Sequence, residues 1–311
     1  MNATWSDALT DATKYEISQH SRNRVALALI VVFIPVWLTL MHMIIPAGPV
    51  EYYHNITDRT VTLDGNRLTT ISGAMNAVTL IIGFMMFSAV RRSMDFDRRL
   101  VLAGYARSAL LLAKLLTLLA AAGVVSLYAT VVLVLFWAPH MLVPFFLSLT
   151  LSGLTYGGIG IVLGLVFRSD LAGMFLIIMI SLVEVMVQNP IIAPSSRSGP
   201  VVLLPTYGSM QNAVGAAFTG DLSVSYYLLG LLWLGATATL GLIAFHRRTR
   251  DHIHRLDTPT PRAAPDRVAT IVVTPGADGT LRVQSTSGPV LVCSCLASSE
   301  TAPTSRALIT G

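Results

Sequence analysis

The 311-residue chain has few charged side chains: Asp, Glu, Lys and Arg together make up 12% of it, whereas 53% is hydrophobic. A soluble domain carries about a quarter charged residues. The mean hydropathy of +0.67, with several apolar runs of about 20 residues, is typical of a membrane protein. Lysine occurs only as Lys14 and Lys114, so arginine supplies nearly all the positive charge.

Cysteine is also scarce, and is confined to Cys293 and Cys295 near the C-terminal end. This C-x-C pair has no second half-site, so we expect two reduced cysteines and no bound metal. A cleavable signal peptide is not expected, because residues 1–24 are polar and contain acids ahead of the first apolar run.

The motifs of common enzymes are missing as well. The sequence has no H-E-x-x-H, no Gly-x-Ser-x-Gly and no pair of acids within an apolar run, so an intramembrane enzyme ranks third among the functions considered. Neither Lys14 nor Lys114 stands in a G-x-x-x-x-G-K-[ST] context. We therefore predict that the chain is not an enzyme and that any ATP-driven role needs an ATPase on another chain.

Six apolar runs predict membrane spans, at about 25–45, 71–90, 115–137, 143–167, 171–192 and 226–245. The third boundary rests on length, because a single helix over 100–137 would be ~57 Å long, nearly twice the ~30 Å hydrocarbon core. We place the start of this span after Lys114, whose ammonium near a helix end can reach the lipid head groups, and its far end at Trp137. Both residues are predicted membrane anchors, and Lys114 is not expected to be a buried functional charge.

The distribution of Lys and Arg predicts the orientation. With the N-terminus inside, the outer loops carry only Arg59, Arg67 and Arg197, whereas the cytoplasmic flanks carry most of the others. The predicted fold is an all-α polytopic membrane protein with six transmembrane helices and cytoplasmic N- and C-termini. Residues 1–24 form an interfacial segment, 25–250 the transmembrane domain, and 251–311 a cytoplasmic tail that is largely disordered.

Several shorter elements are predicted outside the spans. Residues 4–20 form an amphipathic helix and 95–113 a second helix on the cytoplasmic face, each of which could also rest there with no partner. The Asp64-Gly65 pair within 61–68 indicates a hairpin turn, and 201–218 a short re-entrant or surface helix. In the tail, 268–274 and 280–285 could pair as strands.

Glu184 is the only acid well inside a predicted span, and Gln188 and Asn189 follow it closely. An ionised group at membrane depth is costly and is therefore a functional candidate. Alternatively, Glu184 lies near the outer interface and caps the helix end before Pro190. The sequence does not separate these two interpretations.

Three stretches carry a resemblance to a known family: RRLVLAGYARSALLLAK at 98–114, Leu204-Pro205-Thr206-Tyr207, and the glycine-rich segment 153–164. With six spans, an amphipathic N-terminal helix and a charged helix between spans two and three, residues 1–250 resemble the permease subunits of ABC-2 type exporters. The tail after 258 departs from the short ending that is usual in this family.

The resemblance implies a multi-pass protein of the bacterial cytoplasmic membrane that exports an amphipathic small molecule, such as an antibiotic or drug, or a lipid-linked substrate. It implies a second permease, as a copy or a paralogue, and two copies of a P-loop ATPase subunit that hold the ATP and Mg, with no cofactor on this chain. Membrane lipids are the other expected partners, and nucleic acid is not one.

The resemblance also assigns roles to segments and residues. Helix 95–113 would be the coupling helix and 4–20 the connecting helix, while Glu184, Gln188 and Asn189 would lie on the substrate path near the outer gate. The residues implied in coupling to the ATPase are Asp97, Arg98, Arg99, Gly104, Tyr105 and Arg107. The alternative function is a membrane anchor or assembly protein that recruits a cytosolic partner through its tail.

Overall fold

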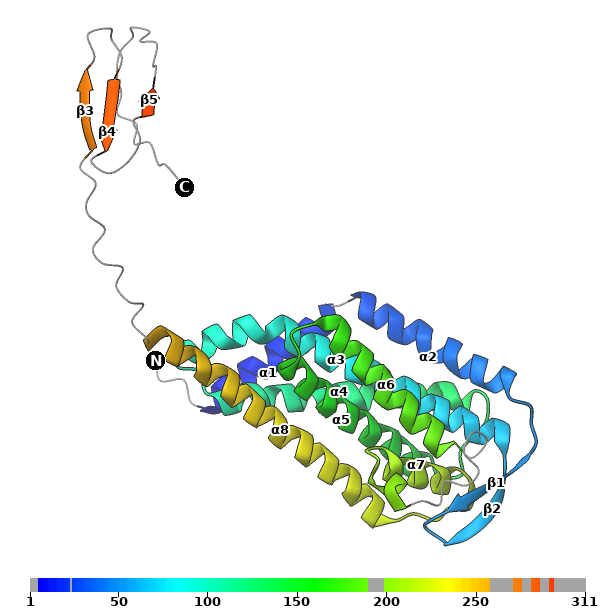
Figure 1. The fold of residues 1–311 in the computed structure, drawn as a ribbon. Coiled ribbons are helices and arrows are strands. Elements are labelled where there is room, and N and C mark those ends of the chain that lie inside the picture. Colours follow the sequence, from blue (N-terminus) through cyan, green and yellow to red (C-terminus); the bar gives the residue numbers. More distant parts are fainter. Residues whose placement is uncertain are drawn as a thin grey trace. The chain divides into compact units, whose positions relative to one another are not determined.

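The computed structural model describes residues 5–22, 24–189, 199–257, 271–275, 281–285 and 291–293. The chain divides into two units, Met1–His252 and Ile253–Gly311, and each is described by itself. The first is mostly helical, and Figure 1 shows its long helices side by side. In order, its elements are α1 (Trp5–Arg22), α2 (Arg24–Ile44), β1 (Pro49–His54), β2 (Arg59–Asp64), α3 (Gly65–Leu102), α4 (Arg107–Val134), α5 (Leu142–Val166), α6 (Asp170–Gln188), η1 (Gly199–Leu203), α7 (Tyr207–Val214), η2 (Gly215–Thr219) and α8 (Val224–Asp257).

Five helices of the described chain are long and apolar enough to cross a membrane: α3, α4, α5, α6 and the Val224–Arg247 part of α8. Helix α2 contributes a shorter apolar stretch at Ile30–Ile44. A hydrocarbon core of about 30 Å needs about 20 apolar residues in helical form. These helices are therefore those of a multi-pass membrane protein.

The helices run between two ends of the bundle. One end, here the junction end, holds the α3–α4 junction (Ala103–Ala106) and the α5–α6 turn (Phe167–Ser169). There Arg91 of α3 donates to Asp170 at 2.7 Å and to the Phe167 carbonyl at 3.1 Å, and Arg107 of α4 donates to His246 of α8 at 3.3 Å. The flanks that were predicted to share one face of the membrane thus lie together in space.

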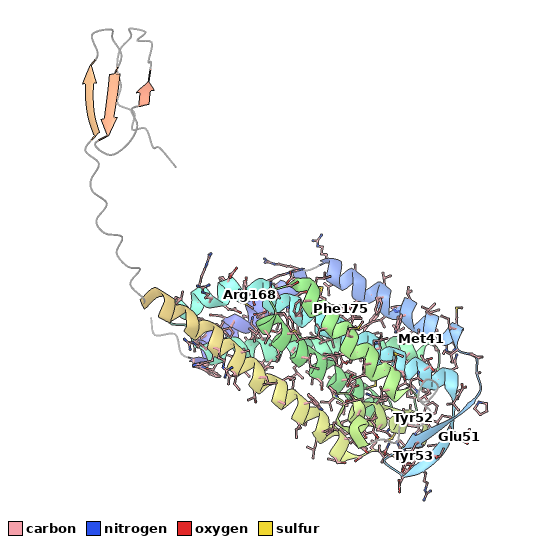
Figure 2. All side chains as sticks on the ribbon, viewed as in Figure 1. Met41, Glu51, Tyr52, Tyr53, Arg168 and Phe175 are labelled. Carbon is pink, nitrogen blue, oxygen red and sulfur yellow. The ribbon has the colours of Figure 1, made fainter. Side chains whose placement is uncertain are left out.

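The other end, here the hairpin end, is covered by β1, β2 and α7. Figure 2 marks the two ends: Arg168 belongs to the junction end, and Glu51, Tyr52 and Tyr53 belong to the hairpin. Asn55 N donates to Gln211 Oε1 of α7 at 3.1 Å. This contact attaches the hairpin to the short helix that was predicted within 201–218.

The centre of the bundle is the pair α3 and α5, which approach closely at small residues. A Cβ on Gly160 would collide with the Gly83 carbonyl oxygen, and one on Gly157 would collide with Leu118 of α4. Glycines at these positions let the backbones meet, as is common where helices pack in membranes. The two helices therefore form the rigid core on which the others pack.

The structure corrects the predicted boundary of the third span. Helix α3 continues to Leu102 and α4 begins at Arg107, so no separate helix covers 95–113. The break comes at Gly104, whose φ of 90° favours glycine. The run 100–137 therefore divides at Gly104, whereas the length of a single span placed the division later, at Lys114. The segment predicted to couple to an ATPase is therefore a junction between two long helices.

The predicted turn at Asp64-Gly65 is also wrong. Strands β1 and β2 do pair, from Pro49 with Asp64 to His54 with Arg59, but the turn lies at 55–58. Asp64 instead caps α3 by accepting from Asn66 N at 3.0 Å. An Asp that precedes a helix accepts from an otherwise unpaired backbone N–H. Asp is therefore as suited to capping a helix as to forming a hairpin turn.

The remaining predicted spans agree with helices, since 143–167 matches α5, and 226–245 lies within α8. For 171–192, α6 ends at Gln188, and 190–198 lie outside the described residues. In the second unit, β3 (Ile271–Pro275) and β4 (Leu281–Ser285) pair antiparallel as predicted, and β5 (Leu291–Cys293) adds a third strand. The tail 251–311 was predicted to be largely disordered, but α8 continues in it to Asp257 and the three strands lie within it, while its other residues lie outside those described.

Candidate functional site

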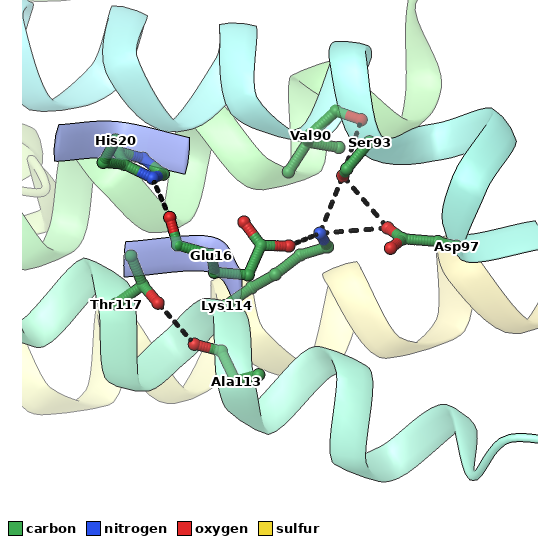
Figure 3. Close-up of polar contacts among 8 residues, drawn as sticks. All are labelled: Glu16, His20, Val90, Ser93, Asp97, Ala113, Lys114 and Thr117. Atoms are coloured by element: carbon green, nitrogen blue, oxygen red, sulfur yellow. Dashed lines mark hydrogen bonds and ion pairs between the residues drawn. The ribbon is translucent and has the colours of Figure 1, made fainter. Parts of the chain in front are cut away.

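The junction end contains a buried ion cluster around Lys114. The side chain of Lys114 is 2% exposed, and its ammonium donates to the Glu16 carboxylate, to Asp97 Oδ2 at 2.9 Å and to Ser93 Oγ at 2.8 Å (Figure 3). Ser93 donates in turn to Asp97 Oδ2 at 3.0 Å. All three ammonium protons therefore have an acceptor, which is the condition for burying this group.

Three helices supply this cluster. Glu16 lies on α1, Lys114 lies on α4, and Ser93 and Asp97 lie four residues apart on α3, where they share one face of the helix. Two carboxylates face one ammonium, so removing the Lys would leave two buried acids without a cation. Breaking a buried ion pair in this way is strongly destabilising, at about 3–5 kcal/mol. The cluster therefore fixes α1 against the ends of α3 and α4.

The prediction that Lys114 is a membrane anchor is wrong. Its ammonium is buried between Glu16 and Asp97 and is not presented at the surface of the bundle. An unpaired lysine in lipid is costly, but Lys114 is paired with the acids of two other helices. Local spacing gave no signal for this, because Glu16 and Lys114 are 98 positions apart.

Two further contacts attach α1 to the junction. The Tyr105 hydroxyl donates to the Ala8 carbonyl oxygen, and Trp5 Nε1 donates to Ser108 Oγ at 3.3 Å. Burial, and to a smaller extent Asp11, raise the pKa of Tyr105 above its usual value. Tyr105 therefore stays protonated and keeps its donor at physiological pH. The predicted connecting helix and the predicted coupling segment are in contact.

The predicted coupling residues divide into two groups. Asp97 is buried in the ion cluster and Tyr105 is occupied by α1, so neither side chain is presented to a partner. Arg99 and Gly104 are exposed, and Arg98 and Arg107 are half-buried. Among the predicted coupling residues, the exposed cation is therefore Arg99, with Arg98 half-buried beside it and Arg107 turned to His246.

A second buried carboxylate, Glu184, lies toward the hairpin end. It is 3% exposed and accepts from the Tyr156 hydroxyl at 2.6 Å, from Thr206 N at 3.1 Å and from Thr206 Oγ1 at 3.0 Å. Gln188 Nε2 also donates to Thr206 Oγ1, at 3.1 Å, and Asn189 is the buried C-cap residue of α6. These contacts join α6 to α5 and to the segment before α7, whereas the structural interpretation had Glu184 capping the helix end before Pro190.

Trp137, the other predicted anchor, follows α4 at the hairpin end. Its ring stacks on Phe218 with centroids 5.5 Å apart, and the Arg67 guanidinium lies 5.5 Å above it. The ring is therefore half-buried beneath η2 and the start of α3. Trp137 therefore packs the end of α4 against η2 and the start of α3.

A cavity of about 360 Å³ lies beside the ion cluster, between α4, α5 and α8. Its lining residues are Trp5, Ser108, Leu111, Leu112, Lys114, Leu115, Gly158, Ile161, Thr237, Ala238, Thr239, Gly241 and Leu242. Within the described ranges, no group of three or more His, Cys, Asp or Glu side chains could hold a metal ion. Neither a protein-family model nor a curated protein matches the chain.

Proposed function

We propose that the chain is the permease subunit of an ATP-driven exporter of the ABC-2 type, with its ATPase on a separate chain. One observation carries the proposal: the exposed basic junction is backed by the buried Lys114 cluster, which joins α1, α3 and α4. A partner that moves the junction therefore moves three helices as one body. A surface loop without this connection would absorb the movement.

The proposal includes a topology of six spans, α2, α3, α4, α5, α6 and α8, in the cytoplasmic membrane of a bacterium. The junction end faces the cytoplasm, where Arg22, Arg92, Arg99 and Arg168 are exposed, and the hairpin end faces outward. Excess Lys and Arg on the cytoplasmic side supports this orientation.

Cysteine labelling tests the orientation. With Cys293 and Cys295 replaced by Ser, a membrane-impermeant maleimide should label Arg59→Cys in intact cells, and Arg99→Cys only after permeabilisation. Both positions are exposed, so burial does not bias the comparison. Labelling with the opposite preference would contradict the topology.

The ATPase partner is expected at Arg98 and Arg99, with two ATPase copies and a second permease completing the exporter. The cargo is an amphipathic small molecule or a lipid-linked substrate. Glu184, Gln188 and Asn189 would stabilise the helix end at the outer gate, and ATP-driven closure would switch the helices between two states.

Photo-crosslinking tests the partner. A photoreactive amino acid at Arg99 should capture a P-loop ATPase that mass spectrometry of the adduct identifies. The same amino acid at Arg59, which is exposed on β2 at the opposite end, should not. If neither position captures an ATPase, or both do equally, the proposal is contradicted.

The tail supports a second function, a membrane anchor that recruits a cytosolic partner. Residues Ile253–Gly311 form a separate unit that contains the β3–β4–β5 sheet. Deleting 258–311 distinguishes the two functions, because an anchor loses its partner whereas an exporter keeps its ATPase. Retained co-purification of the ATPase after the deletion excludes the anchor function.

A further inference from the structure

The cavity between α4, α5 and α8 has walls that suit an apolar occupant. Its aliphatic lining comes from α4, α5 and α8, and its volume of about 360 Å³ lies in the range of about 300–1,000 Å³ that is usual for ligand sites. The hydroxyls of Thr237 and Thr239 donate to backbone carbonyls of α8 itself, at 3.0 Å and 2.7 Å. Both hydroxyl protons are therefore taken up within α8, and Thr237 Oγ1 faces Gly158 on the opposite wall.

Polar groups gather at one end of the cavity. Ser108 Oγ and Trp5 Nε1 line it at the junction end and bind one another at 3.3 Å. The ammonium of Lys114 is committed to Glu16, Asp97 and Ser93, so only the hydrocarbon stem of this residue is available to the cavity. The site is thus mainly apolar along its length and polar at its junction end.

A cation stands beside this polar end. Arg107 directly precedes Ser108, and its guanidinium bridges to His246, which lies one helical turn beyond Leu242 of the cavity wall. Basic groups between transmembrane helices bind anionic lipid head groups. Charge and shape therefore point to the same occupant.

We infer that this cavity binds an anionic membrane lipid, with one acyl chain between α4, α5 and α8 and the head group against Arg107. The lipid fills the space between α8 and the core helices. These helices approach one another closely where Gly158 of α5 faces Thr237 of α8. The inference goes beyond the proposed function and does not depend on it, because it concerns neither the ATPase nor the cargo.

Two glycines of α8 provide a matched pair of variants. A Cβ on Gly241 would lie 3.7 Å from Ile161 Cγ2, which is an ordinary contact, and Gly241 lines the cavity. A Cβ on Gly235 would meet nothing within 4 Å, and Gly235 is exposed outside the cavity. Gly241→Leu therefore fills the cavity, and Gly235→Leu adds the same side chain to the same helix elsewhere.

The test uses the full chain in detergent, stripped of lipid and titrated with equal amounts of phosphatidylglycerol and phosphatidylcholine that carry identical chains. Native mass spectrometry measures the first bound lipid. The parent protein should prefer phosphatidylglycerol, Gly241→Leu should bind it about tenfold more weakly, and Gly235→Leu should bind it as the parent does. Equal binding by the two glycine variants, or no preference in the parent, overturns the inference.

Two further variants test the inference if Gly241→Leu does not fold. Ala238→Leu adds volume at another position of the same wall and should weaken binding of both lipids. Arg107→Gln should abolish the preference for phosphatidylglycerol and leave binding of phosphatidylcholine unchanged. A preference that persists in Arg107→Gln removes the head-group assignment and overturns the inference as stated.

Discussion

At the scale of single residues, the chain contains one lysine within its apolar helices, and the fold neutralises it. An isolated ammonium at membrane depth is costly, so the group persists there only with partners. Glu16 and Asp97 supply two carboxylates, and Ser93 completes the set of acceptors. Lys114 is therefore a structural cation, and we expect its replacement to lower the stability of the fold.

Replacing Lys114 by Met should lower the free energy of unfolding by about 3–5 kcal/mol, because Glu16 and Asp97 would remain buried without a cation. The chain provides its own control, since the only other lysine, Lys14, is exposed on α1. Lys14→Met should change stability by less than about 0.5 kcal/mol. Unfolding in detergent, followed by circular dichroism, compares the two variants.

A compensated variant checks the cause of that loss. Adding Glu16→Gln and Asp97→Asn to Lys114→Met removes every buried charge of the cluster and should recover part of the lost stability. If the triple variant is less stable than Lys114→Met, unpaired carboxylates are not the source of the loss.

His54, on the hairpin, predicts a dependence on pH. It is fully buried, and burial lowers its pKa below the ordinary value of about 6.5, against the opposing effects of the Gln211 carbonyl and Asp221. The unfolded state therefore takes up the proton first as pH falls. The stability that this residue contributes is present above about pH 6.5 and is lost as pH falls through the lowered pKa.

The expected result is faster amide hydrogen exchange of β1 and β2 at pH 5.5 than at pH 7.5, after correction for the intrinsic rate. His54→Asn should remove this excess, because it removes the titrating group. An identical pH response in the parent and in His54→Asn would show that another group is responsible.

At the scale of elements, the close approach of α3 and α5 determines which glycines tolerate a side chain. Gly160→Leu forces the helices apart, because its Cβ collides with the Gly83 carbonyl oxygen, and should cost about 1–3 kcal/mol or more. Gly123→Leu on α4 meets open space and should be tolerated. Equal melting temperatures of the two variants would contradict the packing of α3 on α5.

Helix existence could be predicted from the sequence, whereas helix boundaries and contacts could not. Run length and hydropathy are local, so 143–167 and 226–245 were found within α5 and α8. The division of the long run at Gly104 depends on one backbone conformation, and length arithmetic alone placed it too late.

The candidate site was predicted only in part, for a physical reason. Arg99 is exposed and Arg98 half-buried at the junction, as charge patterning suggests. Asp97 and Lys114 were assigned to the surface because their pairing depends on how α3 and α4 pack together, and because Glu16 comes from α1, which is distant in sequence. Glu184 likewise finds Thr206 only through the fold of the segment before α7.

At the scale of the whole molecule, the basic junction, the buried cluster and α1 occupy one end of the bundle, and the hairpin and α7 cover the other. The core pair α3 and α5 spans the distance between them, and the Glu184 contacts join α6 to that core. This arrangement supports the proposal that a partner at the junction moves the helices together.

The most direct test of that proposal measures ATP hydrolysis. The ATPase that photo-crosslinking identifies is reconstituted, without the crosslink, with the permease in vesicles. The parent should stimulate hydrolysis, Arg59→Glu should stimulate it equally, and Arg98→Glu with Arg99→Glu should reduce it to the rate of the ATPase alone. Equal stimulation by the double variant and the parent would contradict the assignment of the α3–α4 junction as the coupling surface.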